Sequence, residues 1–136
     1  EERQDYHDTV RVYFHHFPLY EHETVMELHA ASVAVQQQGL EHFWEIHDYM
    51  FENLDQEPPI LISPEEMYAY ARDVQGLDME AFDEVYNDPN VMNYILWDKQ
   101  QGVELDVIGT PGIFICGKPM NRGWTEIEAA IDEFLY

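Results

Sequence analysis

The sequence is poor in cysteine and in basic residues. Its 136 residues include one Cys, six Lys or Arg and 28 Asp or Glu, which gives a formal net charge of −22. A single cysteine excludes an intramolecular disulfide framework and a four-cysteine zinc site. The scarcity of Lys and Arg argues against nucleic acid, whose phosphates are neutralised by these residues, and against anionic membrane surfaces. We therefore expect no nucleic-acid partner.

Long apolar runs are also missing. No apolar stretch reaches the roughly 18 residues of a membrane span, so no membrane insertion is expected. The first residues, Glu-Glu-Arg-Gln-Asp, have no apolar region of the kind found in signal peptides. Apolar residues still make up 46% of the chain, which is too much for a disordered acidic tail. The length fits one folded domain of about 100–200 residues.

The seven histidines do not have the spacing of a metal site. His22 begins like the helical His-Glu-x-x-His zinc motif, but Met26 stands where the second histidine is required. His15 and His16 are expected at a strand end, where neighbouring side chains point to opposite sides. We therefore predict no metal site. The acidic residues predict a solvated surface, either ordinary or of the highly charged halophilic kind.

The apolar pattern predicts one strand followed by a series of helices. Val10–Phe14 alternates and is rich in β-branched and aromatic residues, which favours a strand ending before Pro18. Residues 23–38 are apolar on nearly all sides, as is typical of a buried helix. Further helices are expected over residues 43–51, 63–75, 78–86 and 88–102. Ser63 and Glu66 have the spacing of a capping box, and Asp78 suits a helix cap.

The pattern changes after residue 102. Val107-Ile108 and Ile113–Cys116 are expected to be extended, with a tight turn at Gly117-Lys118 and a short strand near Met120. The last helix is expected to begin at Thr125, with Glu128 at capping-box spacing, and to run to Leu135. The order is thus strand, helices, β-hairpin and helix.

Two features of this C-terminal part bear on chemistry. Gly109-Thr110-Pro111 precedes a predicted strand and suits either a cis bond, which costs little before proline, or a plain trans turn. Cys116 fits a small buried apolar residue, or else a reactive thiol if it is exposed with a lowered pKa. Lys118 is close enough in sequence to assist the second role.

The order of these segments resembles the DsbA family of thioredoxin-fold thiol–disulfide oxidoreductases. Its features appear in five stretches: 10–19 with its Phe-Pro-Leu end, 30–39, 43–51 with Phe-Trp and His-Asp, Gly-Leu-Asp at 76–78, and 109–118. The resemblance implies an α/β, thioredoxin-like fold with an inserted helical layer. Its parts would be a strand segment at 1–22, a mainly helical insertion at 23–102, and the cis-proline loop, β-hairpin and closing helix at 103–136.

The resemblance also implies a site and partners. Pro111 would be cis, and Gly109, Thr110 and Pro111 would bind extended polypeptide substrates that carry thiols or disulfides. Strand 10–14 and the hairpin would share one sheet. The family is usually periplasmic or otherwise extracytoplasmic, where disulfides persist. No cofactor is expected.

Two departures from the family matter. The first strand and the Cys-x-x-Cys helix are absent from this sequence, so it contains no catalytic residues for disulfide exchange, which needs a second sulfur. Cys116 stands where the family often has Asn, and Gly112 where it often has Thr. We expect a C-terminal portion of a DsbA-like enzyme whose redox cysteines lie upstream. Completion by a second copy through element swapping or by a separate fragment, repacking, and a redox-inactive peptide-binding module are the alternatives. A kappa-type glutathione transferase has no support, because basic residues are scarce.

Overall fold

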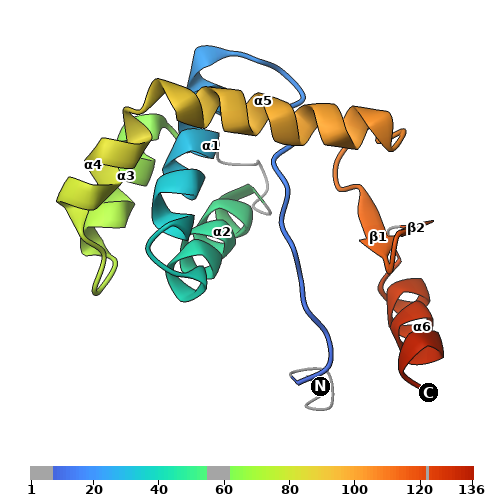
Figure 1. The fold of residues 1–136 in the computed structure, drawn as a ribbon. Coiled ribbons are helices and arrows are strands. Elements are labelled where there is room, and N and C mark those ends of the chain that lie inside the picture. The colour runs from blue at the N-terminus through green and yellow to red at the C-terminus, as the bar shows by residue number, and fades with distance from the viewer. Residues whose placement is uncertain (1–7, 55–61, 122) are drawn as a thin grey trace. The chain divides into compact units, whose positions relative to one another are not determined.

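The structure is a computed structural model that describes residues 8–54, 62–121 and 123–136. The chain divides into two compact units, residues 16–100 and the described parts of 1–15 with 101–136. Each unit is described by itself below. The elements, shown in Figure 1, are α1 Glu23–Gln36, α2 Leu40–Leu54, α3 Pro64–Asp73, α4 Met79–Tyr86, α5 Pro89–Glu104, β1 Ile113–Ile115, β2 Lys118–Met120 and α6 Trp124–Leu135.

Helix α1 is the centre of the helical unit, as its all-round apolar sequence predicts. It packs against α2, α3 and α4. Its buried residues are Met26, Ala30, Ala31, Ser32, Val33, Ala34 and Val35. Small alanines allow neighbouring helices to approach closely, while each buried valine or methionine contributes about 1.5–3 kcal/mol. The helix ends at Gln36, two residues before the predicted end.

The core of this unit forms around large side chains from the surrounding helices. Ile46, Met67 and Phe82 come from α2, α3 and α4, and each is at most 1% exposed. They pack with Ala31, Ala34 and Val35 of α1 in one cluster. A second cluster joins α1 to α5 through Met26, Ala30, Val33, Val91 and Ile95. The helical order predicted for residues 23–102 is therefore present, with shifted boundaries.

The helix starts follow the predicted caps in two cases and differ in a third. The Glu66 backbone N–H donates to Ser63 Oγ at 3.2 Å, and the Ser63 N–H donates to Glu66 Oε2 at 2.8 Å, so the capping box is confirmed. Asp78 caps α4 as predicted. The predicted box at Thr125 is wrong, because α6 begins at Trp124 with Gly123 as its N-cap. The hydroxyl of Thr125 is thus already inside the helix.

The second unit contains the β-hairpin and α6. Strands β1 and β2 pair antiparallel, with Ile113 opposite Met120 and Ile115 opposite Lys118. Cys116 and Gly117 form the connection with φ angles of 48° and 81°. Two successive positive φ angles are typical of the tight turns whose twist matches that of a hairpin. Helix α6 contacts β1, so the hairpin and the last helix form one local packing unit.

The strand predicted at Val10–Phe14 is wrong. Val107-Ile108, which was predicted to be extended, lies outside both strands. In the described parts of the chain the sheet has two strands, β1 and β2, and residues 10–14 are in neither. Val12 and Tyr13 are 69% and 75% exposed. A β-branched, aromatic sequence forms a strand only where a neighbour completes its backbone hydrogen bonds. The shared sheet implied by the family resemblance is therefore not formed here.

Two searches of the described residues bear on the kind of protein. None of the described helices combines the length and apolar character that a membrane crossing requires. The described residues also contain no group of three or more His, Cys, Asp or Glu side chains arranged to hold a metal ion.

Candidate functional site

The loop that precedes β1 is formed by Gly109, Thr110, Pro111 and Gly112. The Thr110–Pro111 peptide bond is cis. Thr110, Pro111 and Gly112 are exposed, and Gly109 is half-buried. Because Pro111 lies two residues before Ile113, the loop leads directly into the paired strand. The structure thus brings the three predicted site residues together at the entrance of the hairpin.

The backbone of this loop is open to an added chain. Among the described residues, the main-chain N–H and C=O groups of Gly109 and Thr110 have no hydrogen-bonding partner. Exposed polar groups of an extended backbone are the feature that strand-adding peptides recognise. The loop can therefore donate to, and accept from, an extended polypeptide without first breaking a bond of its own.

Gly112 lies close to the side chain of Val107. A Cβ atom at this position would lie 3.0 Å from Val107 Cγ1 and 3.2 Å from Val107 Cγ2. Val107 is itself held by its N–H, which donates to the Gly102 carbonyl at 2.9 Å. A residue with a side chain at 112 would have to displace Val107. Glycine thus avoids a tight contact between a side chain at position 112 and Val107.

Cys116 lies in the hairpin turn rather than in the strand predicted for it. Strand β1 ends at Ile115, and the thiol is free and exposed. The buried apolar role, one of the two considered for this residue, is therefore wrong, because Cys116 is exposed in the turn. Since the sequence has one cysteine, this thiol has no second sulfur within the sequence with which to form an intramolecular disulfide.

The unit that holds the loop buries none of its described residues. Ile108 is 99% exposed, Trp124 67% and Tyr136 85%. Apolar side chains of this size are usually buried in a folded domain. Exposed apolar surface is typical of contact sites for other polypeptides. The unit that holds the loop therefore presents exposed apolar side chains.

A buried histidine pair, which sequence reasoning missed, lies in the helical unit. His16 is 1% exposed and its Nδ1 is 2.8 Å from Nδ1 of His29 on α1. The His16 backbone N–H donates to Oδ2 of buried Asp98 at 2.5 Å. Burial lowers the pKa of His29. A histidine on a helix that is apolar on nearly all sides is the signal that would have predicted a buried partner.

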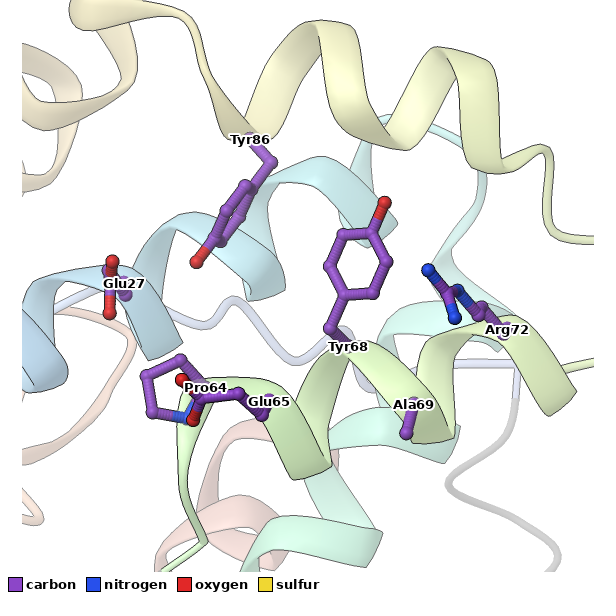
Figure 2. Close-up of a pocket in the computed structure, with 7 residues that line it drawn as sticks. All are labelled: Glu27, Pro64, Glu65, Tyr68, Ala69, Arg72 and Tyr86. Atoms are coloured by element: carbon purple, nitrogen blue, oxygen red, sulfur yellow. The ribbon is translucent and has the colours of Figure 1, made fainter.

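A surface groove between α1, α3 and α4, with a volume of about 360 Å³, was also missed (Figure 2). Its lining residues are Glu27, Pro64, Glu65, Tyr68, Ala69, Arg72 and Tyr86. The residues come from three helices that are separate in sequence, so no local sequence motif predicts the groove. We call it the tyrosine groove below.

The architecture defines a class of protein, and a comparison with known families defines the family. The chain is mostly helical with a small two-stranded sheet, which agrees with an α/β protein. A family model described as thioredoxin matches residues 2–133. The chain therefore belongs to the thioredoxin family. Neither the search of curated proteins nor that of solved structures found a match.

Proposed function

We propose that this chain is the substrate-facing portion of a DsbA-like thiol–disulfide oxidoreductase. In this proposal Gly109, Thr110 and Pro111 bind an extended polypeptide, and a Cys-x-x-Cys pair outside this sequence carries out the exchange. The observation that carries the proposal is the exposed loop of these residues, with open backbone groups, at the entrance to the hairpin of a thioredoxin-family chain.

The chemistry of disulfide exchange explains why the enzyme needs two sulfurs of its own. A thiolate attacks one sulfur of a disulfide, a mixed disulfide forms, and the other sulfur leaves as a thiolate. A second thiolate then attacks the mixed disulfide, so one partner ends as the dithiol and the other as the disulfide. Electrons balance between the two partners. Cys116 cannot supply both sulfurs of this pair, because it is the single cysteine of the sequence.

The proposed partners and compartment follow from the same chemistry. The substrates are polypeptides with thiols or disulfides, bound as extended chains. The proposed location is periplasmic or otherwise extracytoplasmic, because structural disulfides persist there. Association of two copies, by simple contact or by swapping elements, is a further proposal, supported by the large apolar side chains that the second unit exposes.

A second candidate is a redox-inactive module that holds a polypeptide along the same loop. The lone, exposed Cys116 favours it, because the chain then needs no redox pair. The two candidates share the binding step and differ only in the exchange step.

Two experiments separate these candidates. The coding sequence before residue 1 is read for Cys-x-x-Cys, and the encoded protein is assayed for exchange with a thiol peptide. Exchange that disappears when both cysteines become serine supports the oxidoreductase. Binding without exchange supports the module. Robust insulin reduction by the 136-residue chain alone would refute the need for outside sulfurs.

The role of the loop is tested by binding of an extended serine-containing peptide, followed by NMR. We expect amide shifts at Gly109 and Thr110. Thr110→Pro removes one backbone donor and should weaken binding, whereas Thr110→Ser keeps the donor and should bind normally. The amide spectrum of β1 and β2 reports whether each variant retains the hairpin. Shifts confined to other parts of the chain would refute the assignment of this loop.

A further inference from the structure

We propose that the tyrosine groove binds the guanidinium group of an arginine side chain on a polypeptide partner. The groove belongs to the helical unit, and the proposal does not depend on the redox function. Its parts are two aromatic rings, a proline and two carboxylates, provided by α1, α3 and α4 (Figure 2).

Two tyrosine rings provide the surface for a planar cation. The ring centroids of Tyr68 and Tyr86 are 6.2 Å apart and their planes meet at 68°. The two rings are in T-shaped contact. A cation that enters the groove beside them would lie within the roughly 6 Å over which cation–π attraction acts. Pro64 and Ala69 add apolar contact for the methylene stem of the arginine.

The groove already contains one example of the proposed interaction. Arg72 Cζ lies 4.8 Å from the centroid of the Tyr68 ring. In Figure 2, Arg72 and Tyr86 lie on opposite sides of Tyr68. The intramolecular guanidinium therefore already contacts the Tyr68 ring, and the incoming arginine is assigned to the part of the groove on the Tyr86 side of Tyr68, away from Arg72. Arginine is preferred to lysine because its planar group stacks on aromatic faces.

The rings are held in place before any ligand arrives. Phe82, which is 0% exposed, stacks on Tyr86 at 5.6 Å and meets the edge of Tyr68 at 5.4 Å. The Tyr68 hydroxyl donates to the Asp83 carboxylate. This hydrogen bond is the main cause that raises the pKa of Tyr68, so the phenol remains a neutral donor. Little conformational freedom is then lost on binding.

Two carboxylates, Glu27 and Glu65, against the one guanidinium of Arg72 leave the groove lining with a net negative charge. Glu27 lies on α1 and Glu65 on α3, and both line the groove with Tyr86. Burial raises the pKa of Tyr86, and the charges of Glu27 and Glu65 raise it further. The negative potential of these two residues therefore reaches the tyrosine hydroxyl. The chain's net charge of −22 also steers basic partners toward it.

The test compares two short peptides, each acetylated and amidated, in binding to the full chain. One is Gly-Gly-Arg-Gly-Gly and the other has citrulline in place of arginine, which keeps the shape and removes the charge. At low, fixed ionic strength we expect the arginine peptide to bind about tenfold more tightly. Amide shifts should fall on α1, α3 and α4. Equal affinity for both peptides, or shifts elsewhere, would overturn the proposal.

Variants separate the groove from the general acidity of the chain. E27Q/E65Q should abolish most of the discrimination between the two peptides. E41Q/E80Q removes the same charge from exposed residues outside the groove and should keep it. Circular dichroism reports the fold of every variant. Equal losses in the two double variants would show attraction by net charge alone and refute the groove.

Discussion

The buried histidine pair predicts that the helical unit loses stability in mild acid. His16 and His29 face each other through Nδ1 atoms 2.8 Å apart, so one ring must donate a proton and the other must accept it. Protonation of both rings puts two N–H groups against each other. The titratable neighbours of His16 are Asp98, which accepts from its backbone N–H, and Tyr94, whose ring centroid lies 6.1 Å away.

The direction and the size of the stability change with pH follow from proton linkage. Burial lowers the pKa of His29 below the 6.5 of the exposed group. Between these two pKa values the unfolded chain binds a proton that the folded chain does not, so stability falls as pH falls. The slope reaches at most about 1.4 kcal/mol per pH unit for one proton. Below the folded pKa the loss is complete.

The assay is urea unfolding, followed by circular dichroism, at several values between about pH 7 and about pH 5. His29→Gln keeps a hydrogen-bonding side chain but does not titrate, so its stability should fall less steeply with acid than that of the original chain. His22→Gln removes an exposed histidine next to the same helix and should leave the slope unchanged. The carboxylates of the chain contribute to the pH dependence of stability in the same way in all three proteins. Parallel pH profiles for His29→Gln and the original chain would refute the reasoning.

Three further predictions concern stability. Ser63→Ala should cost about 1 kcal/mol in urea unfolding by removing the α3 cap, whereas Thr125→Ala should cost nothing, since that hydroxyl caps no helix. Gly112→Ala should loosen the hairpin by about 1 kcal/mol, seen as faster amide exchange, and adding Val107→Ala should restore it; a double variant no better than the single would disprove the clash. Raising NaCl to about 1 M should raise the melting temperature by screening the net charge of −22, and a fall would contradict dominant self-repulsion.

The helices were predictable because their signals are local. The capping box at Ser63, the cap at Asp78 and the apolar circumference of α1 each depend on residues within a few positions of one another. Helix hydrogen bonds close within the same segment, so the local sequence largely determines where a helix forms. The strand predicted at Val10–Phe14 did not form, because a strand depends on a partner that local sequence does not specify.

The functional features show the same division. Gly109, Thr110 and Pro111 lie together because they are adjacent in sequence. The hairpin was predicted, but its turn is at Cys116-Gly117 rather than at the predicted Gly117-Lys118, because Lys118 already belongs to β2. It did not predict that Gly112 lies against Val107, or that Cys116 is in the turn. The tyrosine groove and the histidine pair were missed because each joins residues that are distant in sequence.

The sequence by itself determined the charge, the helix order and the family resemblance, since composition and local periodicity are properties of the chain alone. Only the tertiary structure decided which polar groups are buried and which side chains meet. Packing α1 against α3 and α4 sets Glu27 beside Tyr86 and brings the Tyr68 and Phe82 rings into T-shaped contact. Burial places His29 against His16 and lowers its pKa. Proximity and desolvation, which arise only when the helices pack, give these residues the chemistry that they lack in the unfolded chain.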